Sequence, residues 1–367
     1  MASIEKLEPG KYEIRWRTPE GKSRRKIIRD GPEQARRFAR NIEAAKDRGS
    51  YIDPRAGKAT VAHWATKWLD AVRPTLKPKT AASYESLLRS RVLPSLGHQR
   101  ISKLKPSDVQ QWIGEMQADQ LSASRIRQAH VVLRQVMDMA VGDGAVARNA
   151  ALGVKLPSLE RREAAFFEPG VVEQIAAEIP PPYDLLARLL GVCGLRWAEA
   201  IGLERRSVDL LRRRLSVATT LSEVGGRFIR TTTKSHAQRS VPLPPSLATA
   251  LARHLESIEP GPDSLIFRGP KGGPLRYRYF YMNLWRPALL RLGLPAVGVH
   301  SLRHSAAARM IAAGWTPKAI QQVMGHRSVS FTLDTYGHLF ETDLDDFAAR
   351  LDDPQIGASR LEGKSRG

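Results

Sequence analysis

Four stretches of the chain between residues 60 and 140 carry apolar side chains three and four positions apart, the spacing of one buried helix face. A β-strand cannot bury such a pattern on one side, because its side chains alternate with a period of two. Each stretch opens with a residue that caps free N–H groups or presets the backbone of a first turn: Thr60, Pro78, Pro106, and Ser122 or Ser124. The pattern therefore predicts an all-helical domain over residues 58–156.

The residues before this domain follow a strand pattern instead. From Tyr12 to Arg17 the side chains alternate between apolar and charged, which predicts a strand with one face toward a core. Further strands are expected at residues 3–7 and 23–29, followed by a helix over residues 31–48. We predict a three-stranded meander backed by one helix over residues 1–57. Its basic open face suits a DNA groove, and a face that only contacts water is the open alternative.

Residues 157–163 (PSLERRE) are polar and charged, and are expected to link the helical domain to a third domain at residues 164–353. Strands at residues 216–221 and 227–232 flank the turn residues Gly225-Gly226, and residues 239–243 are expected to add a third strand. Helices are expected at residues 170–178, 183–193, 197–203, 246–257, 277–292, 302–313, 317–324 and 328–336. A disordered tail is expected at residues 354–367.

The predicted fold class is therefore multidomain α+β. It comprises a small three-stranded sheet plus helix, a helical bundle, and a mainly helical domain with a small antiparallel sheet.

The chain carries a large excess of positive charge. Its 58 Lys and Arg residues against 37 Asp and Glu give a formal net charge of +21. Such a charge repels itself unless a polyanion absorbs it, which favours nucleic acid over the competing candidate, an anionic membrane surface. No apolar run approaches the ~20 residues of a membrane span, and the start lacks a signal-peptide core. The single cysteine, Cys193, excludes an internal disulfide and a cysteine-based zinc site. We expect a cytoplasmic protein that binds DNA.

Several residues of the third domain suit chemistry, although each alone has an ordinary structural explanation. Arg196 beside Glu199 suits an ion pair, and Lys234 suits a solvated turn. His326 suits a helix cap, and Tyr336 suits a packing aromatic.

A pair at the start of one expected helix is more specific. His300 and Arg303 are three residues apart, so both project from one face near free backbone N–H groups that attract an anion. For His304, on the same helix, a packing or surface role is preferred.

Taken as an ordered set, these residues are distinctive. Arg196, Lys234, His300-x-x-Arg303, Gly325-His326 and Tyr336 follow the order and spacing of the tyrosine recombinase (phage-type integrase) family. The segments GLRWAEAIGL, HSLRHSAA, MGH and TYGH are similar to the signature boxes of that family. The chain resembles the family over nearly its whole length. It also resembles the three-part layout of temperate-phage integrases, with an arm-site-binding sheet, a core-binding helical domain and a catalytic domain.

The resemblance implies a site-specific DNA recombinase. Tyr336 would be the nucleophile that forms a 3′-phosphotyrosyl ester, and Lys234 the acid for the departing 5′ oxygen. Glu199 matches an acidic position that supports the first arginine in the family.

The remaining residue types fit this chemistry on physical grounds. Arg196 and Arg303 are permanently charged and donate in pairs, so they suit a phosphodiester whose non-bridging oxygens gain charge. His326 would add a donor to the same oxygens, and His300 would accept the phenol proton. We expect no metal site, because Asp and Glu do not cluster near the histidines, and no cofactor, because no nucleotide-binding glycine loop is present.

Basic residues of the first two domains are the expected DNA contacts: Arg15, Arg17, Arg24, Lys26, Lys77, Lys79, Arg125 and Arg127. The resemblance implies double-stranded DNA with core-type and arm-type sites as the partner. It also implies a homotetramer that forms a Holliday junction, a host DNA-bending protein and an excision factor. The acidic segment 342–351 is expected to dock on a neighbouring protomer, or else on its own domain. The expected location is the cytoplasm of a bacterial host, on DNA.

Two other functions stay open. One is a DNA-binding or architectural protein without catalysis, which the intact residue set disfavours. The other is a type IB topoisomerase-like activity, which the extra basic sheet at the N-terminus disfavours.

Overall fold

The computed structural model describes residues 2–19, 21–48, 51, 53, 56–159, 165–232 and 238–340 of the chain. The predicted tail, the acidic segment 342–351 and Lys234 lie outside these residues. The chain divides into two compact units, Met1–Arg161 and Arg162–Gly367. The separate domains at residues 1–57 and 58–156 stay a prediction.

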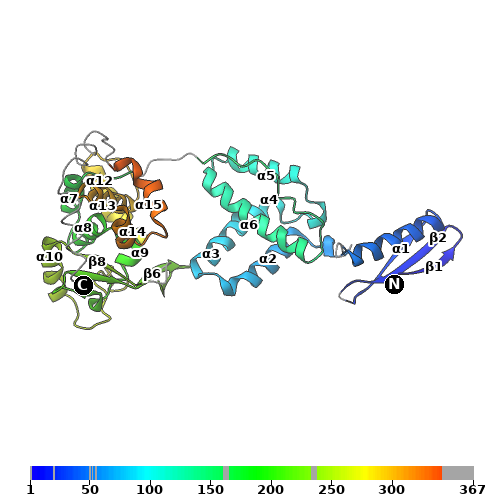
Figure 1. Ribbon diagram of the computed structural model, residues 1–367, viewed down its shortest axis with the longest axis horizontal. Helices are drawn as coiled ribbons and strands as arrows, with labels where there is room; N and C mark the ends of the chain where they lie inside the picture. Colours follow the sequence, from blue (N-terminus) through cyan, green and yellow to red (C-terminus); the bar gives the residue numbers. More distant parts are fainter. Residues whose placement is uncertain are drawn as a thin grey trace, which may run out of the picture. The chain divides into compact units, whose positions relative to one another are not determined.

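The first unit begins with the predicted meander. Strands β1 (Ser3–Glu8), β2 (Lys11–Arg17) and β3 (Ser23–Ile28) form one antiparallel sheet in the order β1-β2-β3, and helix α1 (Pro32–Asp47) follows (Figure 1). Ile14 and Trp16 of β2 are buried together with Ala35, Ala39 and Ile42 of α1. One sheet face is therefore covered by the helix, as the alternation of β2 predicts.

The pairing of β2 with β3 corrects one expectation about the basic side chains. Arg24 lies opposite Trp16 and Lys26 lies opposite Ile14, so both share the face of the buried residues. Arg25 lies opposite Arg15, and these two occupy the open face. The expected set of DNA contacts is therefore split between two faces, because a one-residue step along a strand reverses the side chain.

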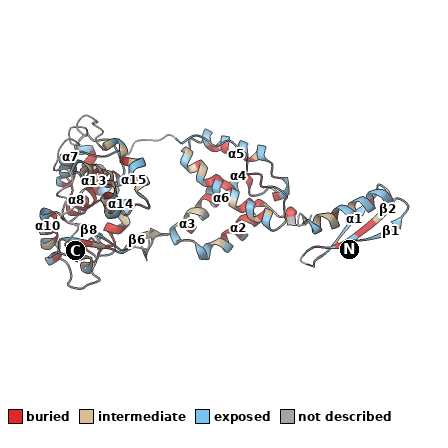
Figure 2. Cartoon of the chain, in the orientation of Figure 1, coloured by how far each residue is buried: buried red, intermediate tan, exposed pale blue. Residues whose placement is uncertain are grey.

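The rest of the first unit is a helical bundle. Its four predicted helices are present as α2 (Val61–Val72), α3 (Pro78–Leu87), α5 (Pro106–Ala118) and α6 (Ala123–Gly142). Helix α3 continues through a π-helical turn, Leu88–Val92, into the short α4 (Leu93–Leu96). Thr60 and Ser122 cap α2 and α6 by accepting from the backbone N–H groups of His63 and Arg125. The buried residues line the inner helix faces (Figure 2).

The second unit surrounds one large apolar core, to which α8 and α13 both contribute buried side chains. Its helices are α7 (Pro169–Ala177), α8 (Tyr183–Cys193), α9 (Trp197–Ala200), α10 (Pro245–Glu256), α11 (Tyr277–Phe280), α12 (Arg286–Arg291), α13 (His300–Ala312), α14 (Pro317–Met324) and α15 (Val329–Tyr336). A π-helical turn, Tyr281–Trp285, joins α11 to α12, so the predicted helix at residues 277–292 is continuous.

The strands of the second unit form two small sheets instead of the predicted single one. The hairpin β6 (Thr219–Val224) and β7 (Arg227–Thr232) is present, with Gly225-Gly226 at its turn. The predicted third strand, β8 (Arg239–Pro242), pairs with β5 (Arg214–Val217), which also pairs with β4 (Val208–Asp209). The reason is packing: Leu215 and Val241 lie opposite each other and are both fully buried in the core.

Candidate active site

The first predicted arginine sits at a broken helix junction. Helix α8 ends at Gly194 in the left-handed conformation, with φ of 67°, and Arg196 is the residue before α9. Glu199, three residues on, accepts from the backbone N–H of Arg196 at 2.8 Å and from its Nη1 at 2.9 Å. The predicted support of Arg196 by Glu199 thus has a local cause, since residues three apart in a helical turn are neighbours.

Arg303 meets the same region from α13. Its side chain is buried and donates to the carbonyl oxygens of Gly194 and Met324. Burial lowers the pKa of Arg303 to about 9, and the positive charge of Arg196 acts in the same direction. Arg303 still carries its proton at neutral pH, so the site holds two buried or half-buried cations.

His326 follows the end of α14 and is also buried. Its Nδ1 lies 2.9 Å from the hydroxyl of Thr332, and its ring stacks on that of Tyr336 with centroids 6.2 Å apart. Burial, followed by the charges of Arg303 and Arg196, lowers the pKa of His326 to about 3. The imidazole is therefore neutral at pH 7.

Tyr336 is the last residue of α15, and its side chain is buried. Burial raises the pKa of the phenol to about 12, although the charge of Arg303 opposes the rise. The hydroxyl lies 2.7 Å from Nδ1 of His304, which is half-buried. His300, the predicted proton acceptor, contacts His304 edge to face, with ring centroids 4.9 Å apart.

This geometry corrects the interpretation of α13. The Tyr336 phenol lies within hydrogen-bond distance of His304, for which the sequence alone favours a packing or surface role. His300 and His304 are one helical turn apart, so both face the same side of α13 and the sequence alone does not distinguish them.

Known proteins and family models match much of this chain. The description "Phage integrase family" matches residues 166–342, and "Phage integrase, N-terminal SAM-like domain" matches residues 60–117. The integrase of Mycobacterium phage L5 is 28% identical over 277 residues, which cover 74% of this chain and 73% of that protein. The ICEBs1 integrase of Bacillus subtilis is 25% identical over 368 residues, which cover 96% of this chain and 99% of that protein.

This chain belongs to the phage integrase family of tyrosine recombinases.

Solved structures of other integrases share the fold. The Tn1549 transposon integrase in complex with a circular intermediate DNA has a TM-score of 0.67 and 22% identity, covering 80% of this chain and 99% of that one. A lambda integrase dimer bound to a COC′ core site has a TM-score of 0.60 and 18% identity, and the match covers 92% of this chain and 96% of that one. Mixed helices with small antiparallel sheets are thus the architecture of this integrase fold.

The sequence pattern assigns no chemical role to three residues that lie near the site: His304, Thr332 and Arg239. His304 lies one helical turn from His300, and Thr332 lies one turn before Tyr336 on α15, so both had a local signal in their spacing. Arg239 had none. It begins β8, forty positions beyond the Glu199 carboxylate to which it donates at 2.9 and 2.6 Å.

The basic residues outside this site are placed as follows. Arg15 and Arg17 are exposed on the open sheet face, and Lys77 and Lys79 are exposed at the start of α3. Arg24 forms a two-pronged ion pair with Asp53, with Nε to Oδ1 at 2.9 Å and Nη2 to Oδ2 at 2.5 Å.

Three further basic side chains are partly engaged within the first unit. Lys26 lies over the ring of Phe38 at 4.4 Å. Arg127 donates to the carbonyl of Pro157 at 2.9 Å, and Arg125 contacts Gln128 at 3.4 Å.

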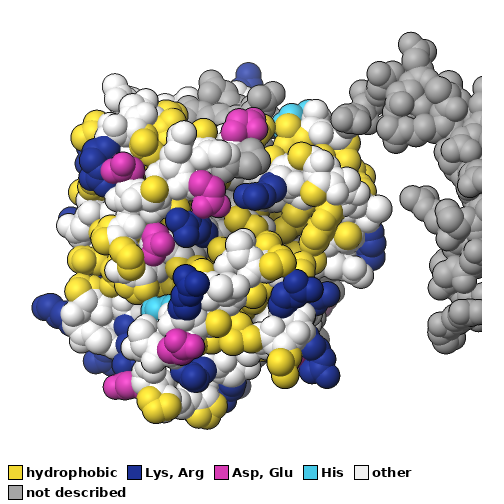
Figure 3. Space-filling model, turned by 90° about the vertical axis from the view of Figure 1, so that its left-hand side faces the viewer, with side chains coloured by type: hydrophobic (Ala, Val, Ile, Leu, Met, Phe, Trp, Pro, Cys, Tyr) yellow, Lys and Arg dark blue, Asp and Glu magenta, His cyan; other side chains and the backbone are white. Residues whose placement is uncertain are grey.

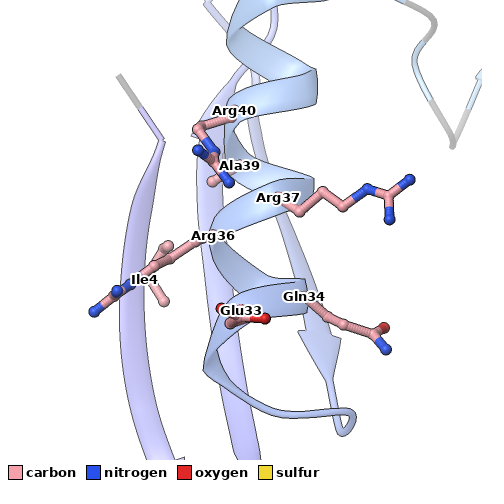
Figure 4. A pocket seen from close by; sticks show the side chains of 7 residues that line it. All are labelled: Ile4, Glu33, Gln34, Arg36, Arg37, Ala39 and Arg40. Atoms are coloured by element: carbon pink, nitrogen blue, oxygen red, sulfur yellow. The ribbon is translucent and has the colours of Figure 1, made fainter.

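Basic side chains also line two other surfaces. On one face of the second unit, Lys and Arg side chains are spread between apolar patches (Figure 3). In the first unit a hollow of about 680 Å³ lies between β1 and α1 (Figure 4), lined by Ile4, Glu33, Gln34, Arg36, Arg37, Ala39 and Arg40.

No group of three His, Cys, Asp or Glu side chains among the described residues is placed to hold a metal ion. No helix in the described ranges is long and apolar enough to cross a membrane.

Proposed function

We propose that the chain is a site-specific DNA recombinase that cuts and rejoins DNA through Tyr336, and that it integrates and excises a phage or other mobile element. One observation carries the assignment to these residues. The Tyr336 phenol lies against two neutral histidines, His304 and His326. The cations Arg303 and Arg196 donate to the carbonyls of the two residues directly before His326. Attack on an anionic phosphodiester requires these groups: a nucleophile, a proton acceptor, and cations that stabilise negative charge on the phosphate.

The two guanidiniums supply electrostatic stabilisation. Attack at phosphorus builds charge on the non-bridging oxygens, and donors held in advance stabilise that charge without reorganising. Arg303 is held by two backbone carbonyls, and Arg196 by Glu199 and the carbonyl of Gly325 at 2.8 Å. The Arg196 side chain keeps 34% of its surface exposed, so it is the more accessible cation for a bound phosphate.

The phenol is the attacking group. As its oxygen bonds to phosphorus, the bond from phosphorus to the 5′ oxygen breaks, and a 3′-phosphotyrosyl ester results. The phenol proton passes to the imidazole of His304, whose Nδ1 lies within hydrogen-bond distance of the hydroxyl, and Lys234 donates a proton to the departing 5′ oxygen. The new ester resembles the phosphodiester that it replaces, so the strand is rejoined by the reverse attack without ATP.

His326 acts as a neutral donor in this scheme. When the Thr332 hydroxyl donates to Nδ1, the ring proton stays on Nε2. That tautomer offers an N–H to a phosphate oxygen, as the assignment of His326 to the oxyanion requires.

The DNA-binding parts are assigned by chemistry and by similarity. Exposed lysines and arginines of the helical bundle, Lys77 and Lys79 among them, would hold core-type sites, and the open sheet face with Arg15 and Arg17 would hold arm-type sites. Four protomers would exchange strands through a Holliday junction, with a host DNA-bending protein and an excision factor setting direction, in a bacterial cytoplasm. The match of the ICEBs1 integrase over 96% of this chain supports a common layout, and lambda integrase has been solved as a tetramer bound to a Holliday junction.

Covalent capture of DNA tests the proposal. Nicked duplexes that tile the DNA flanking the gene would be incubated with the wild-type chain and with Tyr336→Phe, without metal, and denatured with SDS. We expect a protein–DNA adduct on a 3′ phosphate with the wild type and none with Tyr336→Phe. Tight binding without an adduct on any fragment would contradict the proposal and favour an inert DNA-binding protein.

A second assay distinguishes a recombinase from the alternative, a type IB topoisomerase. Supercoiled plasmid with and without the captured fragment would be incubated with the wild-type chain. We expect strand exchange between plasmids that carry the fragment. Relaxation of both plasmids at equal rates, without exchange, would favour a type IB topoisomerase.

A further inference from the structure

The C-terminal end of α14 is held by three arginines from different parts of the chain. Its last two residues and the glycine that follows present three successive carbonyls. Val323 accepts from Nε of Arg239 at 2.7 Å, Met324 from Arg303 at 2.5 Å, and Gly325 from Arg196 at 2.8 Å. The end of a helix leaves carbonyls without partners and carries partial negative charge, so it attracts cations. His326 comes directly after this end, and its position depends on it.

Arg239 also holds the carboxylate that supports Arg196. Its two terminal nitrogens donate to the two oxygens of Glu199, at 2.9 and 2.6 Å. Each Glu199 oxygen accepts a second bond, one from Nη1 of Arg196 and one from the Arg196 backbone. Both oxygens are therefore fully engaged, and Glu199 is a bridge between the two arginines.

The environment of Arg239 separates its role from that of Arg196. Its side chain is 10% exposed, against 34% for Arg196, and its Nε, Nη1 and Nη2 all donate inward. A Cβ at Gly325 would lie 3.1 Å from Nη1 of Arg239, and Gly325 has a φ of 66°. Arg239 thus packs directly beneath the backbone that leads to His326, where it cannot also bind a phosphate.

We propose that Arg239 is a positioning residue for strand cleavage: by holding Glu199 and the end of α14, it sets the Arg196 guanidinium and the His326 ring for the scissile phosphate. This inference rests on the proposed recombinase function. It makes a specific claim about charge, since attack on a phosphodiester leaves negative charge on two non-bridging oxygens, whereas attack on a neutral methylphosphonate leaves it on one. A residue that merely stabilised the fold would affect neutral and anionic substrates alike.

The test compares two substrates in single-turnover cleavage. One is the nicked duplex on which the wild-type chain forms an adduct, and the other carries a neutral methylphosphonate at the scissile position. The variants are Arg239→Gln and Arg239→Lys, with Arg268→Gln as the matched control, because Arg268 forms an ion pair with Glu259 in the same unit. Arg239→Gln should cleave the phosphodiester about 100-fold more slowly than wild type, but the methylphosphonate less than about 10-fold more slowly. Arg239→Lys should recover part of the rate, and DNA affinity should stay unchanged.

Equal losses on both substrates would overturn the proposal in favour of a structural role, and so would wild-type rates for Arg239→Gln. A readout that does not depend on cleavage is the rise in melting temperature caused by orthovanadate, a tetrahedral oxyanion that resembles phosphate. Wild type, Tyr336→Phe and Arg268→Gln should all be stabilised by orthovanadate, and Arg239→Gln should not. If the wild type forms no adduct, the proposed function fails, while the vanadate result still decides whether Arg239 organises an anion site. Equal stabilisation of Arg239→Gln and wild type would contradict that role.

Discussion

The Tyr336 hydroxyl and Nδ1 of His304 lie 2.7 Å apart, which joins the end of α15 to the second turn of α13. Burial raises the pKa of the phenol to about 12 and lowers the pKa of His304 to about 4, with further lowering by His300 and Arg303. At neutral pH the phenol therefore keeps its proton, and the imidazole that lies within hydrogen-bond distance of it is neutral. The nucleophile is held in place together with a group that can receive its proton.

Replacing His304 tests which histidine serves Tyr336. His304→Asn keeps an acceptor near the Nδ1 position but removes the basic ring, and should slow single-turnover adduct formation by about 10- to 100-fold. His304→Phe removes the acceptor as well and should slow it at least as much. DNA binding should be unaffected in both. A wild-type rate for His304→Asn, with a large loss for His300→Asn, would return the proton acceptor to His300.

Thr332 is expected to control the tautomer of His326. Thr332→Val keeps the shape of the side chain but removes the hydroxyl that lies 2.9 Å from Nδ1. We expect about a 10-fold loss of cleavage rate and a loss of about 1 kcal/mol in the free energy of unfolding. Thr332→Ser should restore both quantities. Full cleavage activity in Thr332→Val would show that the hydroxyl does not orient the ring.

Glu199→Gln should strongly destabilise the second unit. The substitution removes the negative charge between Arg196 and Arg239 and leaves two cations facing each other. Because the Glu199 side chain is only 1% exposed, we expect a loss of about 3 to 5 kcal/mol in urea unfolding. Glu259→Gln, which removes an exposed partner of Arg268, should change stability by less than about 1 kcal/mol. Similar losses in the two variants would contradict the bridging role of Glu199.

The free energy of unfolding of the second unit should decrease as the pH falls, in two separate pH ranges. Burial opposes the ionisation of Glu199, but hydrogen bonds and charge from Arg239 outweigh it and lower its pKa from 4.5 to about 2. Its contribution, about 3 kcal/mol, is therefore present above pH 4.5 and lost as the pH falls toward 2. His326 is buried and its pKa is lowered, so the folded state takes up its proton less readily than the unfolded state. The resulting loss of stability begins when the pH falls below 6.5.

A substitution of His326 separates the pH range of this histidine from that of Glu199. Urea unfolding of His326→Gln should depend less on pH between 6.5 and 4 than that of the wild type, while the decline below 4.5 should persist. An identical pH profile for the wild type and His326→Gln would contradict the assigned protonation of His326.

The two faces of the N-terminal sheet should respond differently to substitution. Arg15→Ala, on the open face, should weaken binding to arm-type DNA without slowing cleavage of core-type DNA. Arg24→Ala breaks the ion pair with Asp53, whose side chains are 13% and 15% exposed, and should lower stability by about 2 kcal/mol. Fluorescence anisotropy on the two DNA types, with thermal melting of each variant, gives both quantities. A loss of core cleavage in Arg15→Ala would show that this sheet is not a separate DNA reader.

Local signals in the sequence were sufficient for most of the secondary structure. Thr60 and Ser122 cap their helices, and the alternation of Ile14 with Glu13 and Arg15 is that of β2, because caps and periodicity act within a few residues. The family was also evident from sequence, because Arg196, His300, Arg303, His326 and Tyr336 keep their order and spacing.

Only the tertiary structure decided how these residues are connected. The register of β2 with β3 moved Arg24 and Lys26 to the covered face, and core packing of Val241 against Leu215 paired β8 with β5. The same holds in the site, where Arg239 reaches Glu199 across forty residues of chain. His300 and His304 are equivalent by helical spacing, and the position of α15 against α13 determines which one meets Tyr336. Such contacts arise from the shared burial of distant segments, and no periodicity or local preference records them.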